Sequence, residues 1–307
     1  MNNLKTNKVK PSVSVGVGLR YQHYQDVINS VNNQTTENQV DFIEVHAENF
    51  YAKGGLVLSL LEEVSESYGV SIHGTSLGLA SKIIPNEAIN AFKTLINKIN
   101  PILVSDHASF SWGENILNKK GENIGTQHSG DLLPFVYNQE NLNYFCQNVE
   151  RIQQAIGRQL LIENLSSYIN LGGHSMSEFE FLQQVCQVTG SGLLLDINNI
   201  YVNSFNDQSE DPLETIISSI SEIDQSLVKE IHLAGCSIPN SGDMMIDDHS
   251  QQVNDTVWQA YAHAINKFGL IPTLIEWDND LPPWSKLSQE ANKARTIAVN
   301  STLAGNP

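Results

Sequence analysis

The stretch that decides the fold spans residues 192–197, GLLLDI, an apolar run that ends in an acidic residue. Apolar runs of this length are typical of strands that are buried on both faces of a parallel sheet. The same kind of run recurs at 12–19 (SVSVGVGL), 41–46 (DFIEVH), 70–73 (VSIH), 102–107 (ILVSDH), 159–164 (QLLIEN), 228–233 (VKEIHL) and 272–278 (PTLIEWD). The sequence therefore predicts eight short strands along almost the whole chain.

Segments with helical character lie between these runs. Apolar residues recur with the period of a helix at 88–99 (AINAFKTLINKI), 142–156 (LNYFCQNVERIQQAI) and 257–268 (VWQAYAHAINKF). Ser177 with Glu180, and Asp211 followed by Pro212, are typical helix starts. Alternating strands and helices in this number predict an α/β fold, a single (β/α)8 TIM barrel of the xylose-isomerase-like kind.

An open, doubly wound sheet is the alternative architecture. That fold normally carries a glycine-rich phosphate-binding turn after its first strand. Here Gly16 and Gly18 run directly into LRYQ, without such a turn, so the closed barrel is the favoured prediction. We expect the barrel to span residues 12–300, with an N-terminal tail at 1–11 and a C-terminal tail at 301–307.

The composition narrows the classes of function. With 40% hydrophobic and 17% charged residues among 307, the chain is typical of a globular protein. Its formal net charge of -17 would repel a phosphate backbone, which argues against nucleic acid as a partner. We find no signal-peptide core and no apolar run of about 18 residues, so we expect a cytoplasmic protein without a membrane segment. The three cysteines have no CxxC spacing, so a metal site would use His and carboxylates.

Ionisable residues stand where nearly every predicted strand ends. In a closed parallel barrel these positions converge on the C-terminal mouth, where barrel enzymes keep their active sites. Strands two to eight end in His46, His73, His107, Glu163, Asp196, His232 and Glu276. The loop after the seventh strand adds Asp247 and His249 in MIDDHS.

A single His or Asp at a strand end is more often a turn or cap residue than a ligand. Seven ionisable residues at equivalent strand ends need another explanation, because burying so many unpaired charges would cost a prohibitive amount of free energy. Bound metal ions would remove that cost. Imidazoles and carboxylates without thiolates suit iron, manganese or zinc. One such ion uses three or four protein ligands, so the set predicts two or three ions that share carboxylates. His128, His174 and His263 we interpret as structural or surface residues.

Further residues near the strand ends are candidates for orienting the ligands or the substrate. They are Arg20, His23, Glu44, Asn164 and Asn199. Asn at a strand end is also common turn chemistry, and Glu44 lies on the same side of its strand as His46. The long segment 109–137, rich in Gly and Asn, is typical of a lid or a substrate wall.

The segments VGVGLRYQHY, DFIEVHAENF, SIHGTSLGLAS, LVSDHASFSW, LLIENLSSYI, LLLDINNIYVN, EIHLAG, IDDHSQQV and TLIEWDNDLP occur in this order. Together they resemble the MbnB-like and TglH-like family of multinuclear non-haem iron enzymes, over roughly residues 15–295. The resemblance implies a TIM barrel with two or three irons at its mouth, held by the nine strand-end and loop residues named above.

The resemblance also implies an activity. Family members of known function are oxidoreductases of natural product biosynthesis that use O2 to modify cysteine residues of ribosomally made peptides, together with a small partner protein. For this chain we therefore expect Fe2+/Fe3+, O2 as co-substrate, a cysteine-containing precursor peptide and such a partner, with zinc or manganese possible after purification. We predict that His232, Glu163, Asp196 and Glu276 are catalytic, and that Glu163 and Asp196 bridge the ions.

Other functions fit the same ligand types. Sugar isomerases and metal-dependent endonucleases also place His, Asp and Glu at the ends of barrel strands. An endonuclease should have a basic groove, which the net charge of -17 argues against. A sugar isomerase usually has a Lys near its metal, and no predicted strand ends in one. A scaffold that only binds a partner is the third alternative.

Overall fold

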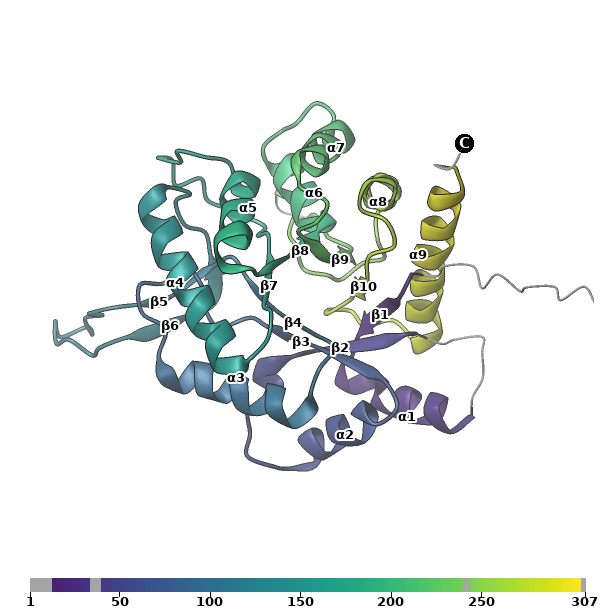
Figure 1. Ribbon diagram of the computed structural model, residues 1–307, viewed down its shortest axis with the longest axis horizontal. Helices are drawn as coiled ribbons and strands as arrows, with labels where there is room; N and C mark the ends of the chain where they lie inside the picture. Colours follow the sequence, from purple (N-terminus) through teal and green to yellow (C-terminus); the bar gives the residue numbers. More distant parts are fainter. Residues whose placement is uncertain (1–12, 34–39, 240–241, 243, 305–307) are drawn as a thin grey trace, which may run out of the picture.

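The computed structural model describes residues 13–33, 40–239, 242 and 244–304 of the chain, so the predicted N-terminal tail lies outside the described residues. Eight parallel strands form a closed barrel in the order β1-β10-β9-β8-β7-β4-β3-β2, which confirms the predicted TIM barrel (Figure 1). The barrel strands are β1 (Val15–Gly18), β2 (Phe42–His46), β3 (Gly69–Gly74), β4 (Leu103–His107), β7 (Leu161–Glu163), β8 (Gly192–Asp196), β9 (Val228–Ala234) and β10 (Thr273–Glu276). Each lies inside or within one residue of a predicted apolar run.

Helices surround the barrel and connect its strands (Figure 1). The α-helices are α1 (Tyr24–Asn33), α2 (Leu56–Ser65), α3 (Asn86–Ile99), α4 (Gln139–Ile156), α5 (Glu178–Thr189), α6 (Ile197–Asn206), α7 (Pro212–Glu222), α8 (Asp255–Phe268) and α9 (Trp284–Ala304). Two short 3-10 helices, η1 (Tyr21–His23) and η3 (Ala47–Phe50), follow β1 and β2. Helix α9 continues past residue 300, where we expected the C-terminal tail to begin, because Ser301 is buried against the barrel domain.

The predicted helix starts are formed by the expected side chains. The Ser177 hydroxyl accepts a hydrogen bond from the Glu180 N–H, and the Glu180 carboxylate accepts one from the Ser177 N–H, which completes a capping box. Asp211 caps α7 by accepting from the Glu214 N–H, with Pro212 in the first turn. Local sequence therefore determines where α5 and α7 begin.

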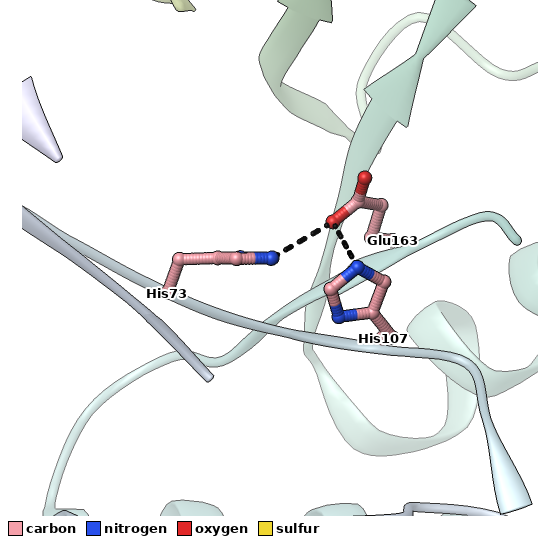
Figure 2. Close-up of side chains that lie close together, drawn as sticks. All are labelled: His73, His107 and Glu163. Carbon is pink, nitrogen blue, oxygen red and sulfur yellow. Dashed lines mark ion pairs between the residues drawn. The ribbon is translucent and has the colours of Figure 1, made fainter. Parts of the chain in front are cut away.

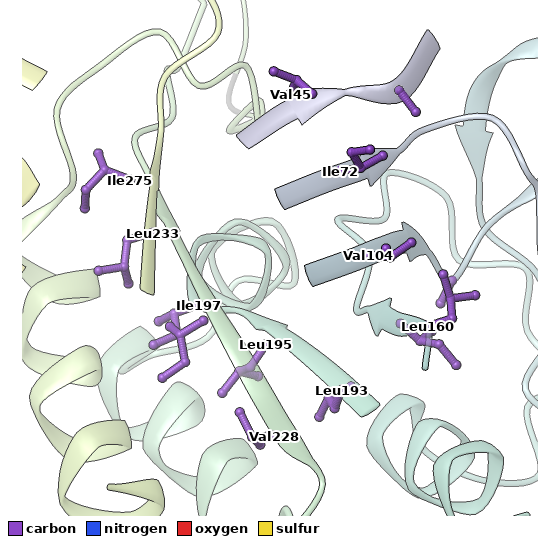
Figure 3. Close-up of a cluster of buried hydrophobic side chains, with 14 of the residues drawn as sticks. Val45, Ile72, Val104, Leu160, Leu193, Leu195, Ile197, Val228, Leu233 and Ile275 are labelled. Atoms are coloured by element: carbon purple, nitrogen blue, oxygen red, sulfur yellow. The ribbon is translucent and has the colours of Figure 1, made fainter. Parts of the chain in front are cut away.

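The two sides of each barrel strand carry different chemistry. Val45, Ile72, Val104, Leu195 and other alternate residues are buried in one apolar cluster with the helices (Figure 3). The intervening residues point into the barrel, since side chains alternate along a strand. Near the start of β1 the interior is packed tightly, because a Cβ at Gly16 would come within 2.5 Å of the Phe42 ring. Towards the C-terminal ends of the strands the side chains that point into the barrel are ionisable.

The segment after β4 contains an element that we did not predict. We expected a lid or a substrate wall and predicted no strands there, and β5 (Phe110–Gly113) and β6 (Gln127–Leu133) pair as an antiparallel two-stranded sheet. Its hairpin extends away from the barrel (Figure 1). The ring of Trp112 stacks edge-on against His128 across the pair, with centroids 4.8 Å apart. Gly and Asn obscured the strands, because β-propensity depends on such cross-strand contacts more than on composition.

No helix among the described residues is long and apolar enough to cross a membrane.

Candidate metal centre

The nine predicted ligands gather at one end of the barrel. Five sets of three His, Asp or Glu residues bring potential ligand atoms within 4.8 Å of one another. These sets are His73/His107/Glu163, Glu163/Asp196/His232, Glu44/His232/Glu276, Asp196/His249/Glu276 and His46/Glu276/Asp278. Because sets share members, they form one continuous cluster rather than separate sites.

The deepest part of the cluster centres on Glu163, at the end of β7. Its Oε2 lies 3.3 Å from the Nε2 of both His73 and His107, which come from β3 and β4 (Figure 2). The other ring nitrogen of each histidine contacts protein: His73 Nδ1 lies 2.7 Å from Ser105 Oγ, and His107 Nδ1 lies 3.2 Å from the Gly74 carbonyl oxygen. Histidine ligands commonly have one nitrogen fixed in this way while the other faces the metal.

Asp196 and His232 complete what we call the inner ligand group, namely His73, His107, Glu163, Asp196 and His232. His232 Nδ1 lies 3.9 Å from Glu163 Oε1, and both Asp196 and His232 have no exposed surface. Across the group, exposure does not exceed 11% for any side chain with an ion pair. The inner ligand group is therefore almost completely shielded from solvent.

A second part of the cluster, the outer ligand group, consists of His46, Glu276 and Asp278. His46 Nε2 lies 3.4 Å from Glu276 Oε1 and 3.8 Å from Asp278 Oδ2. The side chains of His46 and Asp278 are each 22% exposed, so this group faces the solvent. The guanidinium of Arg20, after β1, donates to His46 Nε2 at 2.9 Å and to the Asp278 carboxylate.

His249 connects the two groups from the loop after β9. Its Nδ1 lies 3.6 Å from Glu276 Oε2, and its Nε2 lies 2.9 Å from Asp247 Oδ1. Asp247 itself is held in place, because it accepts hydrogen bonds from Asn198 Nδ2 (2.6 Å) and Ser166 Oγ (3.0 Å). Asp247 therefore lies beside the cluster through His249.

Two of the residues expected to orient ligands do so by hydrogen bonding. Asn164 Nδ2 donates to the Asp196 carbonyl and its Oδ1 accepts from the Asp196 N–H, which ties the ends of β7 and β8 together. Asn199 donates its N–H to Asp196 Oδ1 at 2.6 Å and its amide to Glu163 Oε1 at 3.5 Å. Asn199 thus restricts the orientations of the two carboxylates, while Asn164 fixes the Asp196 backbone.

Glu44 and His23, which we also expected to orient ligands, lie in different places. Glu44 enters the cluster: its Oε2 accepts from Ser71 Oγ at 2.8 Å and lies 3.6 Å from His232 Nε2. His23 is fully buried elsewhere, with Nε2 2.9 Å from the Pro282 carbonyl oxygen and its ring tilted against Trp284. The structure does not bring His23 into any of the ligand sets.

The sequence reasoning missed two acidic members of the cluster, Glu230 and Asp278. Glu230 is fully buried, with Oε1 3.8 Å from His232 Nε2. Each missed residue stands two positions from a predicted ligand, as Glu230 does from His232 and Asp278 from Glu276. The two-residue period of a strand puts such pairs on one side, so applying it one step back from His232 and one step forward from Glu276 would have found both.

The cluster leaves several buried polar atoms without hydrogen-bond partners. In the described part of the chain these atoms include Glu163 Oε2, Asp196 Oδ2, both carboxylate oxygens of Glu230 and both ring nitrogens of His232. Unsatisfied buried polar atoms are costly and rare in folded proteins. These atoms converge without aligning as donors and acceptors, which is the arrangement that cation ligands have. The donor set therefore fits metal ions.

Burial and mutual repulsion disturb the protonation of the histidines. Burial lowers the pKa of His107 to about 4, and it lowers the pKa of His73 well below the usual value, with further lowering from the neighbouring His107 charge. Both rings are therefore neutral near pH 7. A neutral imidazole is the form that binds a metal, so these two residues are ready to act as ligands.

Two buried carboxyls and His232 respond in a different way. Burial raises the pKa of Asp196 to about 7 and the pKa of Glu163 well above its usual range. Burial alone would lower the pKa of His232, but Glu44 and contacts with Glu230 and Glu276 outweigh it and raise that pKa. Without bound cations the buried Asp196 and Glu163 carboxyls thus tend to retain protons, as expected where burial disfavours the charge and like charges crowd together.

Fold and site together define a class: a xylose-isomerase-like (β/α)8 barrel with a candidate metal centre at its C-terminal mouth. Solved structures share this fold. Endonuclease IV from Thermus thermophilus matches with a TM-score of 0.57 and 13% identity, covering 96% of this chain and 100% of that one. A D-psicose 3-epimerase, solved in the presence of D-fructose, matches with a TM-score of 0.54 and 12% identity over 95% and 97%. At such identities the likeness shows the fold alone.

The family follows from sequence. The model of the RiPP precursor modification enzyme family MbnB/TglH/ChrH matches residues 14–299, and the chain belongs to this family. A UPF0276 protein of Chromobacterium violaceum is 36% identical, over 92% of this chain and 94% of the relative. Another from Vibrio vulnificus (strain YJ016) is 38% identical, over 95% and 94%.

Proposed function

We propose that this chain is an iron-dependent oxidoreductase that uses O2 to modify a cysteine residue of a ribosomally synthesised precursor peptide. A small partner protein would help to present the peptide, and the reaction would take place in the cytoplasm. The observation that carries the proposal is the cluster of buried, partnerless carboxylate and imidazole atoms at the barrel mouth. Membership in a family of RiPP precursor modification enzymes supports the peptide substrate.

The residues that would hold two or three irons are those of the inner and outer ligand groups, together with Asp247 and His249. Glu163 and Asp196 each belong to two of the five ligand sets and Glu276 belongs to three, so these carboxylates are the candidates for shared ligands. Bound iron would supply the thiolate binding and the electron transfer to O2 that no side chain can perform.

The chain's own residues would bind and orient the reactants. Asn199 would orient the carboxylates of Asp196 and Glu163, and Asn164 would hold the Asp196 backbone in place beside them. The low exposure of His232 and Glu163 keeps water away from the deepest ligands. Since low dielectric strengthens electrostatic interactions, this burial would strengthen the attraction between these carboxylates and bound cations.

A cavity beside the cluster offers space for the peptide. It has a volume of about 330 Å3 and is lined in part by Tyr137, Leu165, Tyr168 and Leu171. The Tyr168 hydroxyl accepts a hydrogen bond from the Asp247 N–H at 2.8 Å, so the cavity wall adjoins the ligand loop. Its lining also includes Ser167, Asn203 and Asp207, so polar groups lie beside the apolar side chains.

The test is elemental analysis of protein prepared without oxygen, combined with O2 uptake in the presence of synthetic cysteine-bearing peptides and the candidate partner protein. We expect at least two irons per chain and peptide-dependent uptake. His232→Ala should abolish uptake, while the matched control His263→Ala should retain it, because His263 contacts only Ser221 among the hydrogen bonds seen for its ring. Full turnover by an iron-depleted His232→Ala variant would overturn the assignment.

The same measurements separate the alternative functions. A sugar isomerase or an endonuclease-like hydrolase on this barrel would work with manganese, magnesium or zinc and would not consume O2. If O2 uptake stays absent after iron is restored, and D-fructose is epimerised or DNA is cleaved instead, the alternative function replaces the proposed one. A scaffold that only binds a partner would show neither reaction.

A further inference from the structure

Arg20 lies where a cation of the outer ligand group would bind. Its Nη2 donates to His46 Nε2 at 2.9 Å, forms an ion pair with Asp278, and lies 3.7 Å from Glu276 Oε1. These three partners are the complete outer ligand group, whose ligand atoms lie within 4.8 Å of one another. One guanidinium therefore contacts every member of a set that could hold an ion.

The guanidinium and a metal ion would compete for the same atoms. A metal binds the lone pair of an imidazole nitrogen at about 2.0–2.2 Å. In this structure the His46 Nε2 lone pair accepts a hydrogen bond from Arg20, so it is not available for coordination. Arginine also keeps its positive charge at every physiological pH, which would repel an ion placed between the same carboxylates.

The inner ligand group has no such resident cation. Among the described residues, every ion pair between a Lys or Arg and a carboxylate of the cluster is made by Arg20, with Glu276 or Asp278. Buried atoms of Glu163, Asp196 and His232 in the inner group have no hydrogen-bond partner, whereas His46 and Asp278 in the outer group each accept from Arg20. The need for a metal is thus concentrated in the inner group.

Arg20 also has a route out of the cluster. Its side chain is 12% exposed, and its partners His46 and Asp278 are each 22% exposed, so the guanidinium lies at the solvent edge of the barrel mouth. A Cβ at Gly18 would lie 3.6 Å from Arg20 Nη1, so the arginine packs along strand β1 at a position without a side chain. Rotation of the side chain into water would release the outer ligand group.

We propose that Arg20 is a built-in competitor for the outer metal position. An ion binds there only when the guanidinium moves aside, so this position is weak and exchangeable, while the inner positions bind tightly. The inference rests on the metal centre of the proposed function. It makes Arg20 a residue that sets metal stoichiometry between two and three.

The experiment is anaerobic Fe2+ titration of the metal-free protein, with bound iron measured by elemental analysis and by Mössbauer spectroscopy. In Arg20→Gln and Arg20→Met the affinity of the last ion should rise about tenfold or more, because a hydrogen-bonded charge no longer occupies its ligands. Arg20→Lys retains the charge and should stay near the wild type. Arg151→Gln is the matched control. Arg151 donates to the Ile84 carbonyl oxygen and to Asn86 Oδ1, and neither residue belongs to a ligand group.

Chemical rescue and the unaltered protein provide two further readouts. Millimolar guanidinium chloride added to Arg20→Gln should lower occupancy of the last position again while leaving the tighter ions bound. Wild-type protein should release one ion to a chelator at least about tenfold faster than the others. This measurement does not depend on any variant being folded. Circular dichroism shows whether each variant is folded.

The outcomes distinguish this inference from the proposed function. Unchanged affinity in folded Arg20→Gln and Arg20→Met, or equal release of all ions from the wild type, would overturn the role of Arg20 alone. Failure of every protein, wild type included, to bind iron would overturn the proposed metal centre as well. Tight binding of the last ion in Arg20→Gln and Arg20→Met, but not in the wild type or Arg20→Lys, supports both the role of Arg20 and the metal centre.

Discussion

The inner and outer ligand groups use similar side chains in different surroundings. His73, Glu163 and His232 in the inner group are at most 2% exposed, whereas His46 and Asp278 in the outer group are each 22% exposed. The inner group leaves carboxylate and imidazole atoms without partners, and the outer group has its own cation in Arg20. Burial therefore determines whether such a group requires a metal or can be satisfied by the protein.

The sharpest way to break this comparison is Glu163→Gln, which keeps the volume of the side chain but removes its charge. Glu163 Oε2 is 3.3 Å from both His73 and His107, so we expect loss of inner metal and at least about 100-fold lower peptide-dependent O2 uptake. Elemental analysis and oxygen consumption measure both effects. Glu62→Gln, at an exposed carboxylate paired with Lys98, is the control. Unchanged metal content would contradict the inner role of Glu163.

Stepwise removal of metal tests the difference in burial. As chelator concentration rises, we expect the outer ion to leave first with little change in melting temperature. Loss of the inner ions should then lower the free energy of unfolding by on the order of 3 kcal/mol, as for a ligand present at about 100 times its Kd. Thermal unfolding at graded chelator concentrations checks this order. Loss of all ions in one step would show that the two groups do not differ.

A milder change separates the groups from the outer side. His46→Ala removes one of the three outer ligands and leaves the contacts among the inner residues in place. We expect loss of the outer ion, retention of the inner ions, and at most about tenfold lower activity. Metal analysis of the purified variant decides the result, and disappearance of the inner ions would show that His46 supports them too.

The smallest expected effect comes from a residue that only orients a ligand. Ser105→Ala removes the hydroxyl that lies 2.7 Å from His73 Nδ1, so the ring loses one of its fixed contacts. We expect inner metal affinity to fall by about tenfold or less, the lower end for such supporting contacts. Ser288→Ala, at a buried serine that donates to the Trp284 carbonyl, provides the comparison. Equal affinities in the two variants would mean that Ser105 does not position His73.

Much of the fold could be predicted because local patterns and topology agree. The apolar runs predicted all eight barrel strands, and the capping residues Ser177 and Asp211 begin helices as expected. The β5–β6 sheet was missed because a hairpin rich in Gly and Asn is stabilised by pairing across its strands, as between Trp112 and His128. Such contacts leave no periodic signal in one strand alone.

The site was predictable to the extent that a closed parallel barrel brings the ends of its strands together. His73, Glu163 and His232 therefore meet although they are distant in sequence. Glu230 follows the same two-residue period but lies inside a predicted strand, and Asp278 ends the predicted run 272–278 two residues after Glu276. His23 has a suitable side chain yet contacts Pro282 instead. Residue type and spacing indicate which side chains can reach the barrel mouth. They do not indicate which of these side chains contact one another there.

The sequence by itself determined the barrel and most of its ionisable residues, because buried strands need apolar runs and place alternate side chains on one side. It also determined the family to which the chain belongs. Only the tertiary structure decided which residues are dry, which atoms lack partners, and that Arg20 contacts His46 and Asp278. The physical reason is that desolvation and charge pairing depend on distances between residues far apart in the chain, which no local pattern records.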